Sequence, residues 1–145
     1  MRMTRCSASL MGTKTYQGSC HCGQVRYEAD IDLASGTGKC NCTYCMKSRA
    51  WSAHIKPNAF RLLSGKDALI GYHKHPEAPV KFSCNKCGIR THATGDAPWI
   101  GGPYVSVFIN TLDDVDQDEL AVAPVRHSDG LHDNWMNPPK DIRTL

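Results

Sequence analysis

Seven of the eight cysteines stand at short spacings in three motifs, and their thiolates are well suited to bind a metal ion. The motifs are Cys20-His21-Cys22-Gly23, Cys40-Asn41-Cys42-Thr43-Tyr44-Cys45 and Cys84-Asn85-Lys86-Cys87-Gly88. Two cysteines separated by one residue point to the same face of an extended chain, so one metal ion can bind both. A Cys-x-x-Cys pair followed by glycine favours a tight metal-binding turn, because glycine adopts a left-handed backbone at little cost.

The cysteines divide into a set of four and a set of three. A structural zinc site takes four protein ligands in a tetrahedron, and two pairs far apart in sequence supply them: Cys20, Cys22, Cys84 and Cys87. The middle motif supplies only three: Cys40, Cys42 and Cys45. A catalytic zinc keeps one position for water or substrate, so we expect chemistry or ligand exchange at these three cysteines. The sequence therefore predicts two zinc ions per chain.

Each set also has an interpretation without chemistry. The four paired cysteines could be buried reduced cysteines or could form two disulfides. Their short spacings and the lack of a secretion signal favour metal over disulfides. The three-cysteine run could be a second closed structural site completed by a histidine, for which the candidates are His21, His54 and His92. His73 and His75 fall in what reads as a surface loop, and their metal interpretation is weak.

The ligand type limits what a three-cysteine zinc can do. Three thiolates around Zn²⁺ leave the site with one net negative charge, so the ion is a poorer Lewis acid than one held by neutral histidines. This favours capture of a soft fourth ligand, such as a small thiol, over simple hydrolysis. A captured thiol loses its proton and becomes a nucleophile at neutral pH. Zinc deaminases also need a His-x-Glu motif, and the comparable histidine here reads His54-Ile55-Lys56.

Composition indicates an ordinary globular protein. The chain has 145 residues, 41% of them hydrophobic, which is enough for one domain with a core. The net charge of +3 is small and the charges are mixed, which does not indicate a nucleic-acid partner. No apolar run approaches the roughly 18 residues that span a bilayer, so we expect no membrane partner. Eight cysteines without a secretion signal indicate a cytoplasmic location.

The elements that position the motifs read as strands. Residues 1–14 are expected to be a poorly ordered leader containing Cys6, with Met11 as a possible second start, and residues 15–145 a single domain. Alternating apolar and polar residues predict the strands Val25–Ala29 and Trp51–Ile55. Short runs between turn residues predict further strands around Phe60–Leu63, Leu69–His73, Val80–Ser83, Arg90–Ala93 and Tyr104–Asn110. The acidic segment Asp113–Leu120 is the one predicted helix, with Thr111 or Asp113 as its N-cap. We therefore expect a mainly β fold of short antiparallel sheets.

The order of the three motifs resembles the glutathione-dependent formaldehyde-activating enzyme family. The residues that carry the resemblance are Gly18-Ser19-Cys20-His21-Cys22-Gly23, Val25-Arg26-Tyr27, Cys40-Asn41-Cys42 with Cys45, and Phe82-Ser83-Cys84-Asn85-Lys86-Cys87-Gly88. It extends from about Tyr16 to Asp129-Gly130 and Trp135. It implies a β-tent fold, a structural zinc on the four paired cysteines and a catalytic zinc on the other three.

The resemblance also implies a reaction. Members are named for joining formaldehyde to glutathione as S-hydroxymethylglutathione, formally a carbon–sulfur lyase reaction in reverse. Glutathione would then be the co-substrate, and Lys39, Lys47 and Arg49 could attract its carboxylates. Centromere-associated relatives, centromere protein V among them, show that the fold also serves binding roles. Two hypotheses follow: an enzyme acting on a small thiol and an aldehyde, or a non-catalytic binding module stabilised by zinc.

Overall fold

Two β-sheets form the framework of the protein in this computed structural model, which describes residues 12–145. The predicted mainly β fold is confirmed. Most of the expected leader, with Cys6 and Met11, lies outside the described residues. Lys14, which we assigned to that leader, is the first residue of a strand and pairs with Ile31. Within the described residues, no helix is long and apolar enough to cross a membrane.

The smaller sheet has three antiparallel strands in the order β1-β2-β5. Their bounds are β1 Lys14–Ser19, β2 Arg26–Ile31 and β5 Phe60–Ser64. Along β2 every second residue is buried, namely Tyr27, Ala29 and Ile31, as the alternating pattern predicts for a half-buried strand. This face of the sheet is turned to the protein core.

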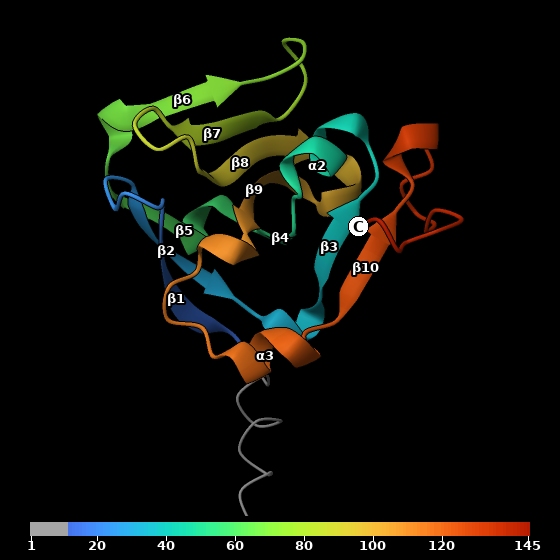
Figure 1. The fold of residues 1–145 in the computed structure, drawn as a ribbon, viewed down its shortest axis with the longest axis horizontal. Coiled ribbons are helices and arrows are strands. Elements are labelled where there is room, and N and C mark those ends of the chain that lie inside the picture. Colours follow the sequence, from blue (N-terminus) through green and yellow to red (C-terminus); the bar gives the residue numbers. More distant parts are fainter. Residues whose placement is uncertain (1–11) are drawn as a thin grey trace, which may run out of the picture.

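The larger sheet has seven strands in the order β10-β3-β4-β9-β8-β7-β6 (Figure 1). Their bounds are β3 Thr37–Cys40, β4 Ser52–Ile55, β6 Leu69–Tyr72, β7 Val80–Cys84, β8 Arg90–Ala97, β9 Gly102–Phe108 and β10 Val125–Ser128. All the predicted strands are present with slightly different ends, whereas β1, β3 and β10 were not predicted. The expectation of purely antiparallel pairing is wrong at one place, because β10 pairs with β3 in parallel.

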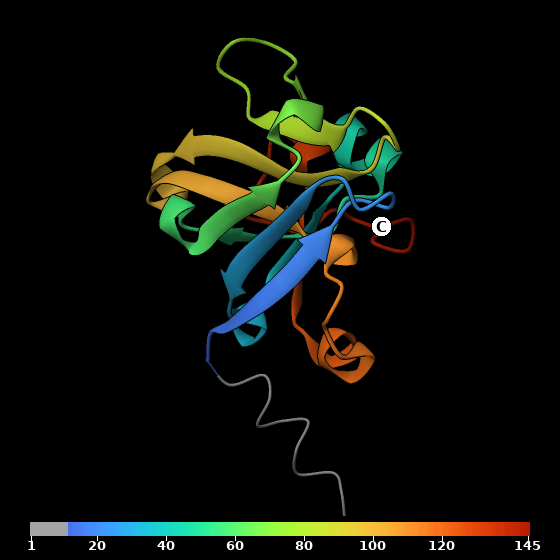
Figure 2. The same ribbon diagram turned by 90° about the vertical axis from the view of Figure 1, so that its left-hand side faces the viewer.

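The core lies between the sheets. Buried side chains of β2, such as Tyr27 and Ile31, pack in one cluster with Val105 and Val107 of β9. Figure 2 shows β1 and β2 crossing in front of the strands of the larger sheet. Short 3₁₀ turns link several strands: Leu33–Ser35, Pro57–Ala59, Lys66–Ala68, Pro98–Ile100, Ile109–Thr111 and Gly130–His132.

The predicted helix begins later than expected. Helix α3 covers Gln117–Val122, and its N-cap is Asp116, whose side chain accepts a hydrogen bond from the Asp118 N–H at 2.8 Å. Asp113 and Asp114 are used elsewhere, because their carboxylates accept hydrogen bonds from Ser19 Oγ at 2.7 Å and from the Gln17 N–H at 2.9 Å. These contacts hold Asp113 and Asp114 along β1, so the helix begins only after them.

A second helix, α2, was not predicted. It covers Thr43–Ser48, inside the middle cysteine motif. It is too short to show an apolar stripe, so periodicity gave no signal for it. Cys42 is its N-cap, and its sulfur accepts a hydrogen bond from the Cys45 N–H.

Packing across the smaller sheet gives a test of the register. Gly18 of β1 pairs with Tyr27 of β2, and a methyl group on Gly18 would overlap the Tyr27 ring. That ring is fully buried, and its hydroxyl lies 2.6 Å from Thr111 Oγ1. We expect Gly18→Ala to lower the free energy of unfolding by about 1–3 kcal/mol, because the buried ring has no space to move. Denaturant unfolding of the metal-loaded protein measures this.

The matched control is Gly38→Ala in β3, where the nearest atom to an added Cβ lies 3.8 Å away. This change is expected to cost less than about 0.5 kcal/mol. Equal losses in the two variants would contradict the predicted packing of Tyr27 over Gly18.

Candidate metal centres

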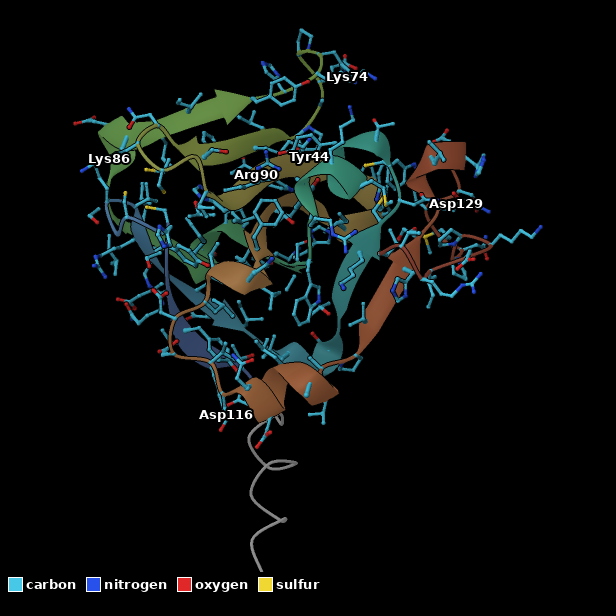
Figure 3. The ribbon with its side chains drawn as sticks, viewed as in Figure 1. Tyr44, Lys74, Lys86, Arg90, Asp116 and Asp129 are labelled. Atoms are coloured by element: carbon cyan, nitrogen blue, oxygen red, sulfur yellow. The ribbon has the colours of Figure 1, made fainter. Side chains whose placement is uncertain are left out.

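The four paired cysteines come together at one end of both sheets. Cys20 and Cys22 follow β1, whereas Cys84 ends β7 and Cys87 precedes β8. Their four sulfurs, the four-cysteine cluster, all lie within 4.8 Å of one another. Lys86, in the turn between Cys84 and Cys87, lies at the far side of the molecule from Asp129 (Figure 3).

Backbone N–H groups surround this cluster. The Val25 N–H donates to Cys20 Sγ at 3.3 Å and the Lys86 N–H to Cys84 Sγ at 3.4 Å. Gly88 adopts the left-handed backbone with φ of 77°, and its N–H closes the turn onto the Cys84 carbonyl at 2.9 Å. Backbone N–H donors also hold the pKa of the Cys87 thiol at about 6, with the N–H of Cys22 as the largest cause. The turn thus favours thiolates over thiols.

The spacing of the sulfurs fits a tetrahedral metal ion. Sγ of Cys22 lies 3.6 Å from that of Cys20 and 3.7 Å from that of Cys84. A tetrahedron with Zn–S bonds of about 2.3 Å places its sulfurs about 3.8 Å apart. The four-cysteine cluster can therefore hold one metal ion with every ligand position filled by the protein.

The second centre is the three-cysteine cluster of Cys40, Cys42 and Cys45, whose sulfurs also lie within 4.8 Å of one another. Cys40 ends β3, Cys42 caps α2 and Cys45 lies in the first turn of that helix. The Cys42 N–H donates to Cys40 Sγ at 3.3 Å, and the Cys45 N–H donates to Cys42 Sγ at 3.4 Å. A strand end and a helix start fix the three sulfurs more firmly than a loop would.

The thiols of this cluster perturb one another. Cys40 and then Cys45 hold the pKa of Cys42 far below its usual range by hydrogen bonding, and Lys81 adds a favourable charge. Hydrogen bonding to Cys40 and then Cys42 raises the pKa of Cys45. Three sulfurs this close share protons unless a cation balances their charge, so three thiolates here require a metal ion.

No fourth protein ligand completes this cluster among the described residues. No described histidine, aspartate or glutamate has a ligand atom within 4.8 Å of all three sulfurs. His92 is buried between the rings of Phe60 and Phe82, and its Nδ1 lies 2.9 Å from Thr91 Oγ1. His54 packs on Tyr104, and His21 belongs to the other end of the molecule.

The turn after β10 closes over Cys40. Asn41 Nδ2 donates to Asp129 Oδ1 at 2.8 Å, and Asn41 Oδ1 accepts from the Leu131 N–H at 3.0 Å. A Cβ on Gly130 would lie 2.6 Å from Cys40 Sγ, so only glycine lets this turn approach the sulfur. The Trp135 ring crowds the same position, because its Cζ3 would lie 2.5 Å from that Cβ. Apart from the family resemblance, no sequence pattern predicted this contact.

A cavity of about 90 Å³ opens beside the three-cysteine cluster and is lined by both Cys40 and Cys45. Two of the three cations that we singled out line it. Lys39 lies with Nζ 5.4 Å from the centre of the Trp51 ring, and Arg49 donates from Nη1 to the Thr144 carbonyl at 2.8 Å. Lys47 is exposed and does not line the cavity.

Two more cations reach the cluster from strands that are distant in sequence. Lys81 of β7 and Arg90 of β8 lie over the ring of Tyr44, with Lys81 Nζ at 4.5 Å and the Arg90 guanidinium carbon at 4.2 Å (Figure 3). Tyr44 stands between Cys42 and Cys45 in α2. Sequence analysis missed both cations, because nothing local shows that β7 and β8 pass beside α2.

The family profile described as glutathione-dependent formaldehyde-activating enzyme, GFA, matches residues 15–128. The chain belongs to this family. The resemblance of the cysteine motifs is thereby confirmed, and all seven clustered cysteines fall inside the matched segment, which ends just before Asp129.

A solved structure has a similar fold. The crystal structure of a Rhodobacter sphaeroides protein matches with a TM-score of 0.64 at 24% sequence identity. The match covers 76% of this chain and 99% of that chain. At this identity, the likeness establishes a common fold.

The two clusters predict different effects of losing one sulfur. We expect two metal ions per chain in protein purified under reducing conditions without chelator. Cys84→Ser should lower the melting temperature by roughly 10 °C or more, because a metal that joins distant strands contributes directly to folding. The Cys42→Ser variant should remain folded with one metal ion fewer. Its melting temperature should fall by only a few degrees, since the ligands of the metal ion at the three-cysteine cluster are close in sequence. Elemental analysis and thermal melts measure both. One ion or fewer in the unmodified protein, or equal losses of melting temperature, would contradict this division.

Proposed function

We propose that this protein is a zinc-dependent enzyme of the carbon–sulfur lyase type that joins glutathione to formaldehyde. The observation that carries the proposal is the three-cysteine cluster, which has no fourth ligand from the described residues and lies beside a cavity lined with cations. Family membership supports the formaldehyde-activating role. Thiolate ligands need a reducing compartment, so we place the protein in the cytoplasm.

Zinc fits both clusters, because sulfur is its usual structural ligand and the sulfur spacing suits a tetrahedron. We assign the four-cysteine cluster to a structural zinc and the three-cysteine cluster to a catalytic zinc. When bound at the second cluster, zinc supplies a positive centre that lowers the pKa of a thiol in the fourth position.

The chain itself contributes orientation and charge. Lys39 and Arg49 lie at the cavity and attract the carboxylates of glutathione, a role that we do not extend to Lys47. Asn41 and Gly130 keep the turn after β10 against Cys40, which fixes one wall of the site. Formaldehyde is a reactive electrophile, so positioning a thiolate beside it is the main requirement.

The reaction balances without an oxidant or a further reactant. The sulfur electron pair forms a bond to the carbonyl carbon, and the carbon–oxygen π pair moves to oxygen. The oxygen takes up one proton, which replaces the proton lost from the thiol. The product is S-hydroxymethylglutathione, and the reverse reaction breaks the same carbon–sulfur bond.

The test is the rate of adduct formation above the spontaneous reaction, followed by NMR exchange between glutathione and its adduct. We expect the zinc-loaded protein to accelerate the exchange and Cys42→Ser to return it to the background rate. S-Methylglutathione, whose sulfur cannot ionise, should bind far more weakly than glutathione. No acceleration, together with no change at the metal on adding thiol, would favour the non-catalytic binding module instead.

A further inference from the structure

Arg90 is a partly buried residue of β8 with hydrogen-bond donors that are not satisfied. Its Nε and Nη1 are buried and have no hydrogen-bond acceptor among the described residues. No ion pair involves Arg90 there, and burial lowers the pKa of its guanidinium. A charged group held in this state costs free energy. A bound water, ion or ligand can supply the missing acceptors.

Aromatic rings hold the guanidinium in place. Its central carbon lies 4.2 Å from the centre of the Tyr44 ring and 5.3 Å from that of Phe108. A guanidinium that stacks through its face keeps its N–H groups in its plane, where they form a fork suited to a carboxylate. The side chain is thus oriented without using its donors.

A second cavity lies at Arg90. It has a volume of about 210 Å³, and Arg49 and Arg90 line it together with Phe108 and Thr111. No acidic residue lines it. Arg49, Ala50 and Asn110 also line the cavity at the three-cysteine cluster, so the two cavities adjoin. Neither of its two cations forms an ion pair with a carboxylate among residues 12–145, which makes the cavity suited to an anion.

We propose that this second cavity binds a carboxylate of the thiol co-substrate, with Arg90 as the main anchor and Arg49 as the second cation. The proposal rests on the proposed function, because it places the sulfur of the same molecule at the three-cysteine cluster. The smaller cavity of about 90 Å³ holds only a few atoms, whereas the cavity of about 210 Å³ has space for the rest of a longer thiol. The enzyme would therefore select thiols that bear a carboxylate over small neutral thiols.

The experiment compares three probes on zinc-loaded protein: glutathione, S-methylglutathione and 2-mercaptoethanol. Arg90→Gln removes the charge, Arg90→Lys keeps the charge without the fork, and Lys74→Gln removes a charge from the exposed loop after β6 as the matched control (Figure 3). NMR titration gives the dissociation constants. Zinc content and thermal melts establish that each variant is folded.

We expect Arg90→Gln to weaken binding of glutathione and S-methylglutathione roughly 10- to 100-fold, which is the usual effect of losing a charged hydrogen bond. Binding of 2-mercaptoethanol, which has no carboxylate, should not change. Arg90→Lys should restore part of the affinity, and Lys74→Gln should have no effect.

Two results would overturn the proposal: unchanged binding of both glutathione probes in Arg90→Gln, or an equal loss for 2-mercaptoethanol, which would indicate a structural role. Failure of the proposed function gives a different result. In that case neither free thiol alters the metal centre, but the binding of S-methylglutathione still depends on Arg90, and the carboxylate site stands.

Discussion

Mutual repulsion between clustered thiolates is the constraint on which this structure depends. The four-cysteine cluster gathers sulfurs from the end of the smaller sheet and from the β7–β8 turn of the larger one. Buried Val25 and Ala68 pack directly beside it, and the main core lies between the same two sheets. Without a cation these thiolates would separate, and the junction between the sheets would open with them. A metal ion converts this repulsion into a cross-link.

The same constraint has a different consequence at the second cluster. There the ligands come from the end of β3 and the start of α2, so the metal ion joins residues close in sequence and adds little to the overall fold. The protein can therefore leave a ligand position unfilled without losing stability. The charge of Lys81 lowers the pKa of Cys42, and Lys39 and Arg49 line the cavity beside the cluster, so these surroundings favour anionic ligands. We propose that structure and chemistry are divided between the two centres in this way.

Local spacing made much of this predictable from sequence. The cysteine motifs and the alternating strands are short-range patterns, so the ligand sets and seven of the strands followed from them. Interactions between distant segments were not predictable. Arg90 packs on Tyr44 only because β8 passes beside α2. Asp113 lies outside the helix that we predicted for it, because its carboxylate accepts a hydrogen bond from Ser19 of β1. The parallel pairing of β10 with β3 has the same origin, since no local pattern fixes which strands become neighbours.

The central claim is that one metal centre is closed and the other has an exchangeable position. Replacing zinc by ¹¹³Cd and recording its NMR spectrum tests this directly, because the cadmium shift reports how many sulfurs bind it. We expect two resonances, one typical of cadmium bound by four sulfurs and one typical of cadmium bound by three. Adding glutathione should move the second towards the four-sulfur range and leave the first unchanged. Two four-sulfur resonances before addition, or a second resonance that glutathione does not move, would contradict it.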